Sequence, residues 1–331
     1  MPSLLLFGAV ACDWLIGHKG FGFSQGEDSS VCSCGFRKSG QRWLGMKPLA
    51  MTRRTFVMTT AMAATTVAWG KAGAQVKVGC QLNGFNPKPD EFDKLLSYVQ
   101  QAKDWGYVGF ETNVRFVSDQ FANAKAARAK IDAIGSTFIG VHTSMDEAAR
   151  ADLAAWCDGA ASLGAKYVVM SAKGLSPTGE FDADALKAKC AQLEAFGKTC
   201  NKHGMQLAYH NHQPEFANHN AENDALADHT DPALVHFLMD AGHGYQGGGD
   251  PAAFMMKYST RIVGCHIKTF LHHDTQVPLG KGDFGFEALA KAIMEKQWAG
   301  WLECEEGGGP QGGDTAAMVP DREYIRKVFH A

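Results

Sequence analysis

Met205-Gln-Leu-Ala-Tyr-His210 is the first of four short apolar segments in the C-terminal half of the chain that end in a residue able to bind a metal ion. The others read Val235-His-Phe-Leu-Met-Asp240, Arg261-Ile-Val-Gly-Cys-His266 and Trp301-Leu-Glu-Cys-Glu305. Each segment has the length and composition of a buried strand, and the four end residues are about 25 to 40 residues apart. A parallel β/α barrel builds its catalytic site at the carboxyl ends of its strands, so this repetition predicts such a barrel with a divalent-metal site.

The same alternation of short apolar runs and longer helical patterns extends over Gln75–Ala331. These 257 residues are about the size of one barrel, and eight units fill the length. We therefore predict a (β/α)8 TIM barrel over residues 75–331, with a doubly wound sheet as the alternative. The expected strands are Val76–Leu82, Tyr107–Glu111, Thr137–His142, Tyr167–Ser171, Met205–His210, Val235–Asp240, Ile262–His266 and Gly300–Glu305. The expected helices include Asp90–Trp105, Met145–Leu163, Asp182–His203 and Phe286–Gln297.

Residues 51–74 have the pattern of an export signal. Met51-Thr-Arg-Arg-Thr-Phe56 is followed by an apolar run, Met58–Trp69, and by Ala72-Gly-Ala74. The paired arginines resemble a twin-arginine signal, and the apolar run of about 12 residues is shorter than the roughly 20 that span a bilayer. We expect a periplasmic or secreted protein, or a cytoplasmic one if the signal is not used. Residues 1–50 lack any sustained period, so we expect disordered upstream sequence with Met51 as the true start.

Composition and charge limit the partners. The 331 residues are 45% hydrophobic and 20% charged, with a formal net charge of −3. Such a chain has no basic surplus for nucleic acid or anionic membranes, so we expect a small-molecule partner and no stable membrane insertion. Association into a homo-oligomer is left open. The six cysteines after Ala74 lie among apolar residues without paired short spacings, which predicts buried thiols.

The four end residues form a predicted ligand set for one divalent ion. Two imidazoles and two carboxylates, from His210, Asp240, His266 and Glu305, suit Mn²⁺, Zn²⁺, Co²⁺ or Fe²⁺ better than Mg²⁺. Glu303 competes with Glu305, because residues two apart on a strand share a face. We prefer Glu305, which is nearer the open end of the barrel.

Longer motifs around these residues resemble one superfamily. Tyr209-His-Asn-His-Gln-Pro-Glu-Phe216, Met239-Asp-Ala-Gly-His243, Arg261-Ile-Val-Gly-Cys-His-Ile-Lys268 and Leu279-Gly-Lys-Gly-Asp-Phe284 occur in this order. The chain resembles the xylose-isomerase-like superfamily of sugar phosphate isomerases and epimerases. This superfamily also includes inosose and dehydroshikimate dehydratases, glycoside-cleaving lyases and apurinic endonucleases. The resemblance implies a β/α barrel with one divalent metal held by the four residues named above.

Two departures bear on the reaction. Ketose epimerases of this superfamily usually carry a glutamate where His210 stands, so only Glu305 remains of their two proton-exchanging glutamates. A neutral imidazole in place of an anion makes the metal a stronger Lewis acid, which suits isomerisation of, or β-elimination from, a keto sugar. The endonucleases carry Asp-x-His where this chain has Asp274-Thr-Gln276, which argues against DNA repair.

Further residues complete the predicted site. The base that moves a proton is expected to be Glu305, His142 or Glu111, and Lys268 is expected to stabilise an enolate oxygen. His212 and His243 are expected to contact substrate.

The sequence thus predicts a metal-dependent sugar isomerase or epimerase that works through an enediolate. A keto-sugar or cyclitol dehydratase or lyase is the enzymatic alternative, and a periplasmic sugar-binding protein is the non-enzymatic one.

Overall fold

The computed structural model describes residues 76–272, 274–305 and 316–331. The predicted export signal over residues 51–74 and the upstream segment 1–50 lie outside these residues and stay predictions. Within the described ranges, no helix combines the length and the apolar character that a membrane crossing requires.

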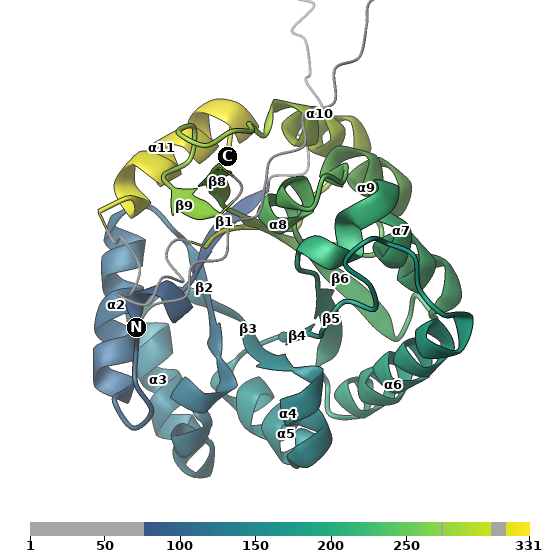
Figure 1. The fold of residues 1–331 in the computed structure, drawn as a ribbon. Helices are drawn as coiled ribbons and strands as arrows, with labels where there is room; N and C mark the ends of the chain where they lie inside the picture. Colours follow the sequence, from purple (N-terminus) through teal and green to yellow (C-terminus); the bar gives the residue numbers. More distant parts are fainter. Residues whose placement is uncertain (1–75, 273, 306–315) are drawn as a thin grey trace, which may run out of the picture. The chain divides into compact units, whose positions relative to one another are not determined.

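A closed barrel of parallel strands forms the centre of the described chain (Figure 1). Around the barrel, β1 pairs with β10 and β2, and the order continues through β7, β6, β5, β4 and β3. This arrangement confirms the predicted TIM barrel. The barrel strands of the described residues are β1 (Lys77–Gln81), β2 (Gly109–Asn113), β3 (Thr137–Ser144), β4 (Tyr167–Ser171), β5 (Gln206–His210), β6 (Val235–Asp240), β7 (Ile262–Ile267) and β10 (Trp301–Cys304).

The helices form an outer ring around the strands (Figure 1). Their apolar faces pack on the barrel; in α2, for example, Leu95, Val99 and Ala102 recur at helical spacing and are buried. The α-helices are α2 (Phe92–Asp104), α3 (Ala124–Ile134), α4 (Met145–Arg150), α5 (Leu153–Leu163), α6 (Ala183–Lys202), α7 (Gln213–His229), α8 (Ala241–Gln246), α9 (Pro251–Tyr258), α10 (Glu287–Lys296) and α11 (Met318–Phe329). Short 3₁₀ helices are η1 (Asn83–Phe85), η2 (Val114–Phe116) and η3 (Ser118–Asn123).

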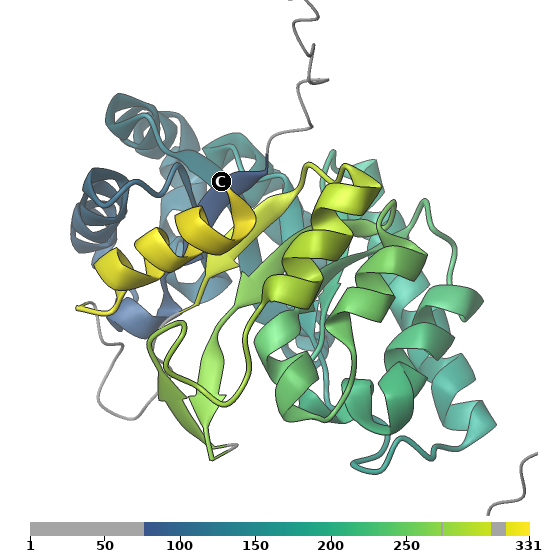
Figure 2. The same cartoon turned by 90° about the horizontal axis from the view of Figure 1, so that it is seen from above.

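Several element bounds shift by one or two residues from the sequence prediction, as in β2 (Gly109–Asn113), and two differences are larger. The single helix expected over Met145–Leu163 is two helices, because Asp152 caps α5 by accepting a hydrogen bond from the backbone N–H of Ala155 at 3.1 Å. An unpredicted antiparallel hairpin, β8 (Thr269–Leu271) with β9 (Thr275–Val277), follows β7. Figure 2 shows this hairpin beyond the end of the barrel at which the strands finish.

An apolar cluster fills the barrel beneath this end. Strand side chains alternate between the interior and the helices, so Ala208 and Leu238, two residues before His210 and Asp240, point inward. We call this group the interior cluster; its buried members are Ile139, Tyr167, Val169, Ala208, Leu238 and Trp301. The interior cluster closes the barrel from below, so polar groups above it reach water only through the open end.

Gly109 is required for this packing. A Cβ at Gly109 would lie 2.7 Å from the Trp301 ring and 3.0 Å from the side chain of Ile139. We expect Gly109→Val to lower the free energy of unfolding by about 1–3 kcal/mol, because overpacking strains a filled interior. The loss is measured by urea or thermal unfolding. Val108→Thr, at an exposed neighbouring position, is the control and should stay within about 0.5 kcal/mol. Equal effects of the two substitutions would contradict the role of Gly109.

Candidate metal centre

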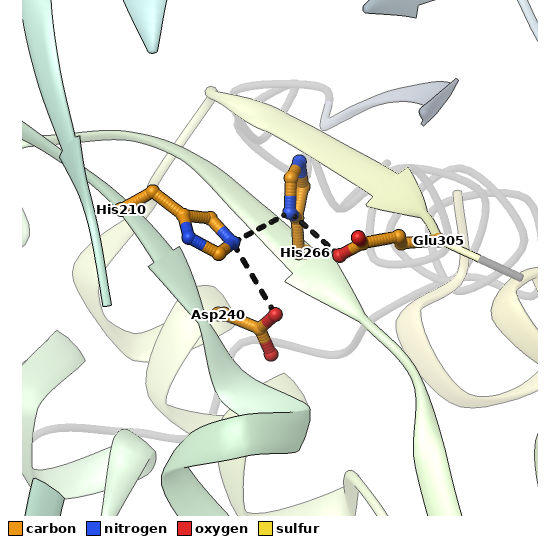
Figure 3. Close-up of side chains that lie close together, drawn as sticks. All are labelled: His210, Asp240, His266 and Glu305. Carbon is orange, nitrogen blue, oxygen red and sulfur yellow. Dashed lines mark hydrogen bonds and ion pairs between the residues drawn. The ribbon is translucent and has the colours of Figure 1, made fainter. Parts of the chain in front are cut away.

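Four side chains converge at the open end of the barrel. His210, Asp240 and His266 end or nearly end β5, β6 and β7, and Glu305 directly follows β10. His210 Nε2 lies 3.0 Å from His266 Nδ1 and 3.4 Å from Asp240 Oδ2, while His266 Nδ1 lies 2.9 Å from Glu305 Oε2 (Figure 3). One nitrogen or oxygen of each residue lies within 4.8 Å of the others. We call these four residues the ligand set.

The ligand set fits a first-row divalent ion. Metal–ligand bonds of about 2.0–2.2 Å imply separations of roughly 2.8–3.6 Å between adjacent ligand atoms. The three separations of 2.9, 3.0 and 3.4 Å lie in this range. Burial, together with the neighbouring His266 and His142, holds the pKa of His210 well below its usual value, so this ring is neutral as a ligand must be. Two imidazoles with two carboxylates form a donor set for Zn²⁺, Mn²⁺, Co²⁺ or Fe²⁺.

Lys268 balances the charge of the two carboxylates. Its Nζ lies 2.8 Å from both Asp240 Oδ2 and Glu305 Oε2. Burial alone would raise the pKa of each carboxyl, but the ammonium outweighs it and holds both values below their usual range. Burial lowers the pKa of Lys268, but the ion pairs with Asp240 and Glu305 outweigh it and raise the value, so this side chain stays a cation and a hydrogen-bond donor.

Two further glutamates lie behind His266. Glu111 Oε1 is 3.5 Å from His266 Nε2, and Glu303 joins them in a second buried group of metal-binding residue types. Within the described residues neither oxygen of Glu303 has a hydrogen-bond partner, and burial followed by the charge of Glu111 raises its pKa well above the usual value. Burial lowers the pKa of His266, but Glu305 and Glu111 outweigh it and raise the value. Glu111 thus contacts Nε2 of His266, whereas Nδ1 of the same ring faces the ligand set.

His142 and Glu111 form a histidine–carboxylate pair. His142 Nδ1 lies 3.0 Å from Glu111 Oε1. The His142 side chain is 13% exposed and Glu111 is fully buried, so only the histidine reaches the open end. Burial raises the pKa of Glu111, but His266 and His142 outweigh it and lower the value to about 2. Glu111 is thus an ionised acceptor beneath the His142 ring.

His212 and His243 form the rim of the centre. The His212 ring is 5.1 Å from both the His210 ring and the His243 ring. His243 stacks on Phe270, the second residue of β8, with ring centroids 5.6 Å apart. The structure thus brings all nine predicted site residues to one end of the barrel.

Residues 99–328 match the family described as the xylose isomerase-like TIM barrel, which is more than half of the chain. The chain belongs to this family. The inosose dehydratase of Salmonella agona (strain SL483) is 32% identical over 135 residues, covering 35% of this chain and 44% of that protein. The inosose dehydratase of Clostridium beijerinckii is 26% identical over 290 residues, covering 77% of this chain and 95% of that protein. A crystal structure of the IOLI protein with a bound zinc atom has a TM-score of 0.59 at 14% identity, covering 77% and 98% of the two chains, and this likeness concerns the fold.

Asn211 supports the ligand set and was missed in the sequence. Its side chain donates to the Asp240 backbone oxygen at 3.0 Å and accepts from the Asp240 N–H at 2.9 Å. Asp240 Oδ1 accepts from the His243 N–H at 2.7 Å, so one carboxylate oxygen caps α8 and the other faces His210. The position of Asn211 directly after a ligand was the available signal in the sequence. The sequence did not reveal its partner Asp240, which ends the neighbouring strand β6.

Loss of one ligand should abolish tight metal binding. We expect the EDTA-treated full chain to bind one Zn²⁺ per molecule, and His210→Ala to weaken this by more than the roughly 10–100-fold that loss of a supporting residue costs. Isothermal titration and elemental analysis measure the effect. His203→Ala is the control, because His203 pairs with Asp158 beyond the end of α6. An unchanged affinity in His210→Ala would contradict the ligand set.

Proposed function

We propose that this protein is a metal-dependent dehydratase that removes water from a keto cyclitol or keto sugar. The observation that carries the proposal is the histidine–carboxylate pair of His142 with Glu111, which lies beside the ligand set. In the resemblance to the two-glutamate epimerases, His210 stands at one of their glutamate positions. The name of the relatives, inosose dehydratase, supports the same reaction. The sequence favoured an isomerase or epimerase and kept the dehydratase as the alternative, so the proposal reverses that order.

The reaction requires one proton to leave carbon and one hydroxyl to leave its neighbour. The C–H bond next to the carbonyl breaks, a C=C bond forms, the C–O bond one carbon further breaks, and the hydroxyl departs as water after taking up a proton. A divalent ion held by the ligand set would act as a Lewis acid on the carbonyl and so acidify the adjacent C–H bond.

His142 is the base in this proposal. Its Nδ1–H donates to the ionised Glu111 carboxylate, which leaves Nε2 free to accept a proton and stabilises the imidazolium that results. Glu305 is a weaker base, because Lys268 and His266 hold its pKa well below the usual range. Glu111 is fully buried, so we assign it a positioning role.

Lys268 and the two rim histidines complete the chemistry. The Lys268 ammonium stays protonated and donates toward negative charge that develops on the substrate oxygen. His212 and His243 contact the hydroxyl groups, including the one that leaves.

Isomerisation or epimerisation is the second candidate. It shares the first proton transfer, and Glu305, with a side chain 21% exposed, is the ligand that reaches toward solvent and could return a proton to carbon. Export to the periplasm remains a proposal that rests on residues 51–74 alone.

Products formed from inosose in D₂O separate these functions. We expect the purified full chain, loaded in turn with Zn²⁺, Mn²⁺, Co²⁺ and Fe²⁺, to eliminate water and give an unsaturated or diketo product detectable by NMR. Exchange of the carbon-bound proton without elimination, or net conversion of keto sugars, would support the isomerase instead. Binding without exchange or turnover would contradict an enzyme and favour the sugar-binding protein.

The His142–Glu111 pair can be tested by separating turnover from metal binding. We expect His142→Gln to lower kcat by about 10²–10⁴-fold, the usual contribution of a positioned base, with metal affinity unchanged. Glu111→Gln should lower kcat and also weaken metal binding by about 10–100-fold, because Glu111 faces both His142 and the ligand His266. Steady-state kinetics and Zn²⁺ titration measure the two effects, with His203→Gln as control. Full activity in His142→Gln would rule out this base.

A further inference from the structure

A cavity of about 680 Å³ lies beside the ligand set, between the ends of β3, β4 and β5 and one face of α6. Ligand pockets for drug-sized molecules range over about 300–1,000 Å³, so this one has room for a substantial group. His212 is the member of the metal centre that also lines the cavity. A substrate ring bound at the ligand set would therefore leave the cavity free to bind a substituent on that ring.

A buried ion pair shapes the wall of the cavity. Lys189 of α6 donates to Glu222 of α7 at 2.5 Å and to the backbone oxygen of Lys173 at 3.2 Å. The second oxygen of Glu222 accepts from the Leu175 N–H at 2.7 Å, so both ends of the pair hold the loop after β4. The side chains of Lys189 and Glu222 are 6% and 0% exposed. The cavity is therefore a built feature of the fold.

The lining combines apolar side chains with uncharged polar ones, among them Ser144, Ser171 and Gln192, and offers little net charge. The apolar lining residues are Met145, Ala172, Leu175, Ala185 and Ala188. Glu222 neutralises the charge of Lys189. The other two charged side chains of the wall, Asp146 and Lys173, carry opposite charges, so they add no net charge to the cavity. A phosphate or carboxylate would thus find no unpaired buried cation among these side chains, whereas an apolar group would bury its surface against them.

We propose that this cavity is a second subsite, which binds an uncharged aryl substituent on the ring held at the metal centre. The thioether of Met145 suits a flat aromatic group, because sulfur makes favourable contacts with aromatic rings, and Ala185 and Ala188 leave space for the ring on the α6 side. The inference rests on the proposed function and narrows it: the substrate is a keto sugar or cyclitol bearing an aryl group, and the unsubstituted ring is a poorer ligand.

Binding of two glucosides tests this subsite. The probes are p-nitrophenyl β-glucoside and methyl β-glucoside, which differ in the aryl group and lack the carbonyl needed for elimination. We expect the Zn²⁺-loaded full chain to bind the p-nitrophenyl compound at least tenfold more tightly by isothermal titration. Ala188→Phe and Ala185→Phe should each reduce this preference to less than threefold. Ala195→Phe is the matched control, exposed on the same helix and outside the cavity, and should keep the preference.

Each outcome bears on the subsite separately from the proposed reaction. Equal affinities for the two glucosides, or no measurable binding of the p-nitrophenyl compound, would overturn the subsite. A preference that survives in both cavity variants would also overturn it, because the aryl group would then bind elsewhere. Neither probe turns over, so the aryl preference is measured independently of elimination. Absence of elimination from both inosose and an aryl-bearing keto sugar, with the aryl preference intact, would contradict the dehydratase and leave the subsite standing.

Discussion

The alternation of strand side chains in a closed barrel is the constraint on which the centre depends. Every second residue of a parallel strand points inward, and all strands end at the same face, so the last inward residues of neighbouring strands must meet. His210 and Asp240 occupy these positions on neighbouring strands, and Leu238 and Ala208, one inward step below, lie in the interior cluster. A shift of one residue in any of these strands would exchange a ligand for a residue of the helix-facing core, as Cys265 next to His266 illustrates.

The interior cluster also determines how strongly the charges above it interact. Water is excluded from below, so the ion pairs of Lys268 with Asp240 and Glu305 lie in surroundings of low polarity, where opposite charges attract more strongly than at the surface. Bringing three such charges out of water is unfavourable, and the close contacts offset that cost. A divalent ion adds positive charge to a site whose two carboxylates already share one lysine. A metal ion bound there would therefore be only partly neutralised, which would favour Lewis acid chemistry.

The sequence predicted the features that depend on local pattern and missed those that depend on partners far along the chain. The strand runs and their end residues could be predicted because burial imposes a short apolar segment at each strand. The break between α4 and α5 depends on the capping by Asp152, which the apolar pattern does not reveal. The contact between His142 and Glu111 joins residues 31 positions apart, so the sequence pattern did not reveal it. The sequence suggested Glu303 only as an alternative ligand to Glu305, and its place in a second buried group of acidic residues was missed. The β8–β9 hairpin is too short to stand out from a loop.

The reaction type depends on the acid and base side chains around the ligand set, because the barrel fold alone does not determine them. A metal held by the ligand set would acidify a C–H bond next to a carbonyl in each of the proposed reactions, so the ligand set does not distinguish elimination from isomerisation. That choice depends on whether the abstracted proton can return to carbon before a hydroxyl leaves. In the proposed reaction, His142 takes the proton and the buried Glu111 carboxylate stabilises the resulting imidazolium, while the rim histidines His212 and His243 would assist the leaving hydroxyl. In the proposed dehydratase, His210 stands where the two-glutamate epimerases would carry a second glutamate, so no second strong base would return the proton on the opposite face. This is why we place elimination ahead of epimerisation.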